Sequence, residues 1–454
     1  MTIGLNIVIA PNEDGFGTSA WVVMLAKELS RHSSIAQVKI VIATKKREDF
    51  HSDKYRDDPN VVLTRLPGQP NRIEVPKNRG AVDVPGTIEQ CILTYPQSRI
   101  EYAEAITSKN VIDDADVIVD FGVPHMARAA YGKRTATIFD HAWSMSLARI
   151  VSSDTPSAPI PQDVNNALED MRNDEALTQQ VILFGAPICP LDYHGYWKRL
   201  LGRTPKVIPG ALGGPLCTLA YAHDPIYAAI RPSFVEKHVA QLSHAVFNLT
   251  TAYAKELLGI TNDKPVLFVS GGGTAVWDDV LSGLVDTYEA SPPSYNVVMF
   301  SPSEVARLGI KLTTETIVLN GTPRTIKRAK SERCDRITFI DTLEGETHHV
   351  LFAAFDLILT RAGGGTVNNA LAFRVPLVLI EEPGMWQVEQ IRRSCVTMGI
   401  AESFSLEDFR QQPRQCIETA TGTLKDLAAQ SQEMHNIPNH GEFWLCHELL
   451  AQAM

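Results

Sequence analysis

The sequence predicts an α/β fold built from two Rossmann-like domains. A chain of 454 residues exceeds the size at which one hydrophobic core stops growing. Its 44% hydrophobic and 21% charged content is that of a globular protein. Short apolar, β-branched runs alternate with helical patterns in two successive series. Runs that are apolar on both faces indicate parallel sheets covered by helices.

The two series divide the chain into predicted domains at residues 1–245 and 246–454. A helical segment, 232–259, begins with Pro232 and lies between them. The last helical segment, 423–454, could pack back across the domain interface. The predicted strands of the first series are 5–10, 38–43, 116–121, 134–140, 180–186 and 205–210, and those of the second are 265–270, 295–302, 316–321, 336–341, 355–360 and 375–382.

Two stretches are interpreted as irregular. Residues 145–179 are rich in Pro and Ser before they turn acidic, and they exceed a usual βα connection, so we expect a mobile loop or a disordered insert. The basic runs at 45–47 and 327–330 are short and are interpreted as solvated loops. With a formal charge of −10, these runs do not indicate a nucleic-acid surface.

The composition also indicates the cellular compartment of the protein and whether it binds a metal ion. The first residues lack a basic region before their short apolar run, and nothing reaches about 18 consecutive apolar residues, so a cytoplasmic protein without a transmembrane segment is expected. The seven cysteines are scattered and form no C-x-x-C pair, and the histidines lack ligand spacing. We therefore predict no metal site.

Two Gly-Gly-Gly-Thr loops, at 271–274 and 363–366, each join a predicted strand to a helix. Glycine lets an anion approach the backbone, and the free N–H groups at a helix start favour negative charge. A single such loop is equally consistent with a tight turn. Two at the same place in one sheet favour a diphosphate site. Neither loop has the lysine of a P-loop or a complete G-x-G-x-x-G pattern.

The segment "FIDTLEGETHHVLFAAFDLILTRAGGGTVNNALAFRVPLVLIEEPGMWQVEQIRRSCVTMGIA", residues 339–401, resembles the donor half of GT-B glycosyltransferases of the MurG-like and UDP-glycosyltransferase group. The resemblance covers the last third of the chain well and the first half in outline. It implies two Rossmann-like domains facing each other across a cleft. The second domain would bind a nucleotide-diphosphate sugar such as a UDP-sugar, the first a small-molecule or glycan acceptor, and no cofactor would be needed.

The resemblance assigns donor-binding roles residue by residue. One glycine loop would hold the diphosphate, the other would lie under the donor, main-chain atoms near Ile340 would meet the nucleobase, and the helix after residue 385 would contact sugar hydroxyls. The first loop supplies Gly272, Gly273 and Thr274; the second supplies Arg361, Gly363, Gly364, Gly365 and Thr366; the helix supplies Gln387, Glu389 and Gln390.

The sequence departs from the family pattern at two positions, the one that would bind the ribose and the one that would act as the catalytic base. Asn369 stands where relatives carry a ribose-binding glutamate, and an amide would hold the hydroxyls more weakly. Thr18 stands where inverting relatives often carry a catalytic histidine. Thr18 cannot act as that base.

Three other residues are candidates for the base. Asp14 and Glu13 lie in the segment PNEDGFGTSAW, residues 11–21, which follows the first predicted strand, and they could deprotonate an acceptor hydroxyl. Their alternative is a structural role in a turn or at a helix start. His141, next to Asp140, is a candidate base or acceptor-binding residue, and a structural histidine is the alternative.

The expected activity is a metal-independent glycosyl transfer, of the hexosyltransferase type, with inversion at the anomeric carbon. Two alternatives remain open. One is a nucleotide-sugar epimerase or hydrolase on the same fold. The other is a non-catalytic nucleotide-sugar-binding subunit, which the lack of a histidine at position 18 would permit.

Overall fold

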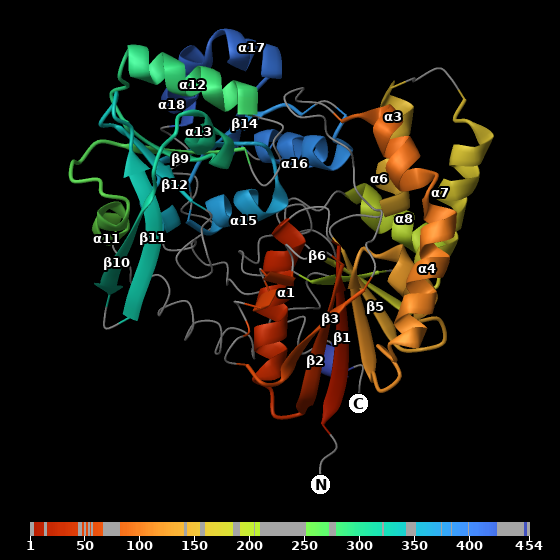
Figure 1. Ribbon diagram of the computed structural model, residues 1–454. Helices are drawn as coiled ribbons and strands as arrows, with labels where there is room; N and C mark the ends of the chain where they lie inside the picture. Colours follow the sequence, from red (N-terminus) through yellow and green to blue (C-terminus); the bar gives the residue numbers. More distant parts are fainter. Residues whose placement is uncertain are drawn as a thin grey trace.

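The structure is a computed structural model, and it describes most of the chain. The described residues are 4–12, 16–43, 48–49, 51–52, 55, 58–66, 82–139, 143–154, 159–184, 191–203, 205–208, 251–271, 278–319, 322–341, 351–373, 375–382, 384–397, 399–424 and 449–451. They form two α/β units, each built on its own sheet (Figure 1). The predicted boundary at 245 lies outside the described residues.

The first sheet is wholly parallel, in the order β3-β2-β1-β4-β5-β6-β7. Its central strands β1 and β4 are buried along most of their length, as the apolar runs predicted, whereas the edge strand β3 is partly exposed. The strands are β1 (Leu5–Pro11), β2 (Ile35–Ile42), β3 (Val61–Arg65), β4 (Val117–Phe121), β5 (Thr135–Phe139), β6 (Gln180–Phe184) and β7 (Lys206–Ile208).

Helices cover both faces of the first sheet. On one face α1 packs against Ile7, Ile9 and Val38, and on the other α4 and α5 pack against Val8 and Ile118. The helices of this unit are α1 (Phe16–Ser30), α3 (Val84–Thr87), the π-helix η1 (Ile88–Ile92), α4 (Tyr95–Ser108), α5 (Pro124–Ala129), α6 (Trp143–Asp154), α7 (Gln162–Glu175) and α8 (Leu191–Leu201).

The second sheet is mixed, in the order β10-β11-β12-β9-β8-β13-β14-β15. The six neighbouring strands β12, β9, β8, β13, β14 and β15 are parallel to one another. Strands β10 and β11 form an antiparallel hairpin at one edge, and β11 pairs antiparallel with β12. The strands are β8 (Val266–Ser270), β9 (Asn296–Phe300), β10 (Thr313–Leu319), β11 (Thr322–Lys330), β12 (Ile337–Ile340), β13 (Leu357–Thr360), β14 (Leu377–Ile380) and β15 (Ala401–Phe404).

Two helical layers also cover the second sheet. Helices α12, α17 and α18 pack on one face, and α11, α15 and α16 pack on the other (Figure 1). The helices are α11 (Thr251–Leu257), α12 (Asp278–Ala290), α13 (Pro302–Arg307), α15 (Gly364–Phe373), α16 (Trp386–Thr397), α17 (Leu406–Gln411) and α18 (Pro413–Leu424).

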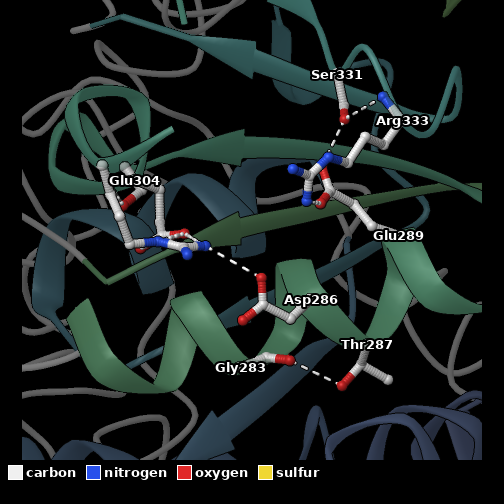
Figure 2. Close-up of polar contacts among 9 residues, drawn as sticks. Gly283, Asp286, Thr287, Glu289, Glu304, Ser331 and Arg333 are labelled. Carbon is white, nitrogen blue, oxygen red and sulfur yellow. Dashed lines mark hydrogen bonds and ion pairs between the residues drawn. The ribbon is translucent and has the colours of Figure 1, made fainter. Parts of the chain in front are cut away.

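Charged contacts on the surface hold α12 in place. Figure 2 shows Asp286 and Glu289 projecting from α12 toward neighbouring elements. Asp286 accepts from the Arg307 guanidinium at 3.3 Å, and Glu289 Oε1 accepts from the Ser331 hydroxyl at 2.8 Å. Because α12 follows the 271–274 loop in sequence, these contacts fix the helix to which that loop leads.

Two predictions about irregular stretches are wrong. Residues 143–154 and 162–175 form helices α6 and α7, because Val164, Leu168 and Met171 recur at helical spacing and are buried. Residues 327–330 belong to β11 rather than to a loop. Burial alternates where the strand enters this run, since Ile326 is buried and Lys327 is exposed, as expected for a strand with one solvated face.

Candidate functional site

The two glycine loops leave neighbouring strands at the same edge of the second sheet. In the parallel pair β8–β13, Ser270 lies opposite Thr360. The chain therefore enters both loops side by side, at the carboxyl edge where open α/β sheets bind ligands. Gly272, Gly273 and Thr274 lie outside the described residues, so the geometry of this edge comes from the second loop.

The second loop gives α15 an open amino terminus. Gly363 precedes the helix, and its carbonyl accepts the Val367 amide at 3.0 Å. The amides of Gly364, Gly365 and Thr366 thus fall in the first turn, where no carbonyl four residues earlier is available. All three residues are partly exposed. Apart from its chain neighbours and the backbone of its own helix, no described heavy atom lies within 4 Å of the position that a Cβ on Gly365 would take.

Arg361 carries positive charge to the base of this loop. Its Nη1 donates to Oε1 of Glu382 at 3.1 Å, which ties the end of β13 to the end of β14. Glu382 is only 1% exposed, and burial raises the pKa of its carboxyl while Arg361 opposes that shift. Its second oxygen, Oε2, has no hydrogen-bond partner within the described part of the chain. A buried acceptor of this kind is costly unless a proton, water or ligand satisfies it.

The start of α16 adds a second pair of charges. Glu389 accepts from Arg392 at 2.8 Å and from the Glu382 amide at 3.3 Å. The predicted sugar-binding carboxylate is therefore already held within the protein. Gln390 is partly exposed, whereas the side chain of Gln387 lies outside the described residues.

The two remaining predicted donor residues are largely buried. The side chain of Ile340 is 1% exposed and lies in the core at the carboxyl end of β12. A nucleobase could therefore contact only the main chain of this residue. Asn369 lies on α15 and is 9% exposed.

The predicted catalytic residues Asp14, Glu13 and His141 lie outside the described residues. Thr18 is partly exposed in the first turn of α1. Helix α6 begins two residues after His141, and Glu175 accepts from both the Ser144 amide, at 2.9 Å, and the Ser144 hydroxyl, at 2.6 Å. A buried carboxylate from α7 thus caps the helix that follows His141.

Asp120 is a buried polar residue near the carboxyl edge of the first sheet, and it is not among the predicted site residues. It is the fourth residue of β4 and lies opposite Ala10 of β1, one strand from the loop that contains Asp14. Burial raises the pKa of Asp120 to about 7, and it accepts the Val123 amide at 3.0 Å. The available signal was the acidic residue at position 120, which interrupts the apolar run 117–121.

The carboxyl edges of the two sheets face each other. Helix α16, which follows the carboxyl end of β14, contacts α6, which follows the carboxyl end of β5 (Figure 1). Ligands bound at either edge would therefore lie between the domains. This arrangement suits a reaction between two substrates held on different domains.

The described residues lack two other kinds of feature. Among the described residues, no helix is both long and apolar enough to cross a lipid bilayer. Nor do the described residues contain a group of three or more His, Cys, Asp or Glu side chains placed to bind a metal ion.

Comparisons with known proteins identify the fold. No family model matches the chain, and no curated protein sequence matches it. Solved structures with the GT-B fold match over nearly the whole chain. UGT71G1 from Medicago truncatula, complexed with UDP-glucose, has 12% sequence identity and a TM-score of 0.59, covering 100% of this chain and 99% of that one.

Two further structures agree. The glycosyltransferase VinC in complex with DTDP has 14% identity and a TM-score of 0.56, with 99% of both chains covered. MurG from Acinetobacter baumannii has 13% identity and a TM-score of 0.51, again with 99% of both chains covered. The chain therefore has the GT-B fold, as the resemblance of residues 339–401 implied.

Proposed function

We propose that this protein is a glycosyltransferase that moves a sugar from a nucleotide-diphosphate donor to a hydroxyl group of an acceptor. The observation that carries the proposal is the loop of Arg361 and Gly363–Thr366, which presents partly exposed helix-start amides at the carboxyl edge of the second sheet. The fold supports it, since UGT71G1 has been solved with UDP-glucose and VinC with DTDP.

In the proposed reaction, the acceptor oxygen attacks the anomeric carbon as the bond from that carbon to the diphosphate oxygen breaks. Negative charge then develops on the leaving diphosphate. The amides of Gly364, Gly365 and Thr366 and the positive end of α15 would stabilise that charge without reorganisation. Arg361 lies at the base of the same loop, so its charge acts in the same direction.

The acceptor proton would pass to a base on the first domain. Asp14 remains the first candidate, with His141 and Glu13 after it. Direct displacement inverts the anomeric centre, and we propose inversion without a metal ion because helix-start amides and Arg361 supply the positive charge. The donor would use main-chain contacts near Ile340 for its base, Asn369 for its ribose, Gly272, Gly273 and Thr274 for its diphosphate, and Gln387, Glu389 and Gln390 for its sugar.

Gly365→Ala tests the diphosphate site with little disturbance of the fold. Its methyl group would enter open space in the free protein, and alanine in a helix is more favourable than glycine by roughly 0.5–1 kcal/mol. The free protein should therefore melt at the same or a higher temperature. Binding of UDP or dTDP should weaken at least about tenfold, which equals about 1.4 kcal/mol, because the methyl group blocks approach to the amides.

Gly283→Ala is the matched control. Gly283 also lies in a helix with open space at its Cβ position, but on α12. It should raise stability similarly and leave nucleotide affinity unchanged. Equal nucleotide affinities for Gly365→Ala and the wild type would show that the diphosphate does not bind this loop. Release of UDP from UDP-glucose only when an acceptor is present would separate transfer from hydrolysis.

A further inference from the structure

The segment between β14 and α16 contacts the first domain at Gly384. This glycine has φ +89°, and a Cβ on it would lie 3.4 Å from the Val82 Cβ and 3.7 Å from the Val82 amide nitrogen. Val82 packs against the buried core around α15 and α16 and also against the core beneath α3 and α6. The positive φ favours glycine at this position, and an added Cβ would be in ordinary van der Waals contact with Val82.

A second contact follows two residues later, at Trp386. The Arg149 guanidinium of α6 lies 5.8 Å from the Trp386 ring centroid, within the range of a cation–π interaction. Trp386 also packs against an aromatic platform on the first domain, made of Val181, Tyr196 and Trp197.

The aromatic platform is rigidly held. The Tyr196 and Trp197 rings meet edge to face at 5.5 Å between centroids. The Tyr196 hydroxyl donates to the buried Glu175 carboxylate at 2.8 Å, and that carboxylate also caps α6 at Ser144. The position of Trp386 is therefore set by groups that are themselves fixed in the first domain.

The same short segment belongs to the proposed donor site. Trp386 is the first residue of α16, and Gln387, Glu389 and Gln390 are among the four residues that follow it. The Glu389 carboxylate accepts the Glu382 amide, and Glu382 binds Arg361 at the base of the glycine loop. A displacement of Trp386 would thus move the first turn of α16 relative to the loop.

We propose that Trp386, held by Arg149 and the aromatic platform, is a positioning residue that makes recognition of the donor sugar depend on contact between the domains. This inference rests on the proposed function. The nucleotide diphosphate would be held by the glycine loops, independently of Trp386. The sugar would be held by the first turn of α16, which has its correct position only while Trp386 is seated on the first domain.

The test compares Trp386→Ala, Trp386→Phe and Arg149→Met with the wild type. UDP and UDP-glucose affinities are measured by calorimetry, and the separation of the domains by small-angle X-ray scattering. Trp386→Ala should increase the radius of gyration, because the domains move apart. It should leave the affinity for UDP unchanged. UDP-glucose should then bind no more tightly than UDP, whereas in the wild type the glucose increases the affinity. Arg149→Met should reduce that gain roughly two- to fivefold, as expected for an exposed cation–π pair. Trp386→Phe should restore most of it.

Arg393→Met is the matched control, since Arg393 is an exposed arginine on the same helix. It should change neither scattering nor either affinity. Equal weakening of UDP and UDP-glucose binding, or unchanged scattering in Trp386→Ala, would overturn the inference. Arg149→Met removes no buried group, so it keeps the test valid if Trp386→Ala fails to fold. If the wild type binds neither nucleotide, the proposed function fails, and scattering alone decides whether Trp386 holds the domains together.

Discussion

At the scale of single residues, Asp120 is a buried acid in a chain of hydroxyl groups. The Thr137 hydroxyl lies 2.7 Å from Asp120 Oδ2 and 2.8 Å from Thr178 Oγ1, and Thr178 donates to the Gln180 carbonyl at 3.1 Å. Thr137 has one hydroxyl proton and cannot donate to both neighbours. A protonated Asp120 completes the chain, because it donates to Thr137, Thr137 donates to Thr178, and Thr178 donates to Gln180.

Asp120→Asn should mimic the protonated acid. Its amide can donate to Thr137 and its oxygen can accept the Val123 amide. Because the pKa of Asp120 is raised from 3.8 to about 7, the folded wild type binds more protons than the unfolded chain between these values, and its stability falls as pH rises through this window. The loss is on the order of 4 kcal/mol at most.

Thermal melting of both proteins from pH 4 to pH 8 measures this effect. The two should melt at similar temperatures near pH 4, and Asp120→Asn should melt progressively higher toward pH 8. A constant difference between the two curves would show that Asp120 does not titrate in this range.

The sequence could predict the glycine loops but not Asp120. A strand followed at once by glycines and a helix is a local pattern, so the place of Gly363–Thr366 followed from its neighbours in the chain. The environment of Asp120 depends on Thr137 and Thr178, which come from other parts of the chain. The ion pair between Glu382 and Arg361 could not be predicted either. It joins the ends of β13 and β14, and the sequence does not show that these two strands are neighbours in the sheet.

At the scale of elements, the hairpin of β10 and β11 was only half predicted. The apolar run 316–321 indicated β10, but the polar sequence of β11 resembles a loop when its partner is unknown. In the folded chain, Arg328 of β11 binds Glu315 of β10. Its guanidinium also covers Gly259, which ends the turn after α11 with φ +69°. Arg328 thus connects the hairpin to the helix that enters the second domain.

Gly259→Ala should destabilise the protein by more than backbone strain alone. A Cβ at this position would overlap the Arg328 guanidinium, which Glu315 holds in place. Gly309→Ala is the control, because Gly309 has a similar φ of +64° with open space at its Cβ position. Strain should cost both variants about 1–2 kcal/mol, and displacement of Arg328 should add to the cost at Gly259. Urea unfolding of the two variants measures the difference, and equal losses would mean that Arg328 moves aside freely.

At the scale of the whole molecule, the chain returns to its first domain. Leu449 and Leu450 are buried in the core formed by β1, β2 and α1, although the second sheet accounts for the chain from β8 to β15. The first domain is therefore completed by residues from the end of the sequence. Leu449 and Leu450 therefore connect the two domains through the chain itself. Trp386 and Gly384 connect them at a different place, through noncovalent contacts.

Leu449→Ala should consequently weaken the first domain rather than the second. Leu449 is fully buried, and replacing a buried leucine by alanine costs about 2–5 kcal/mol through lost apolar contact and the cavity that remains. Hydrogen exchange resolved by segment should show faster exchange in β1, β2 and α1 while β8 and β13 keep their protection. Leu406→Ala is a control of the same chemistry on α17, which packs with the second core, and it should give the opposite distribution. If Leu449→Ala accelerated exchange equally in both sheets, the two domains would unfold as one cooperative unit, and the contacts at Trp386 and Gly384 would be strong enough to join their stabilities.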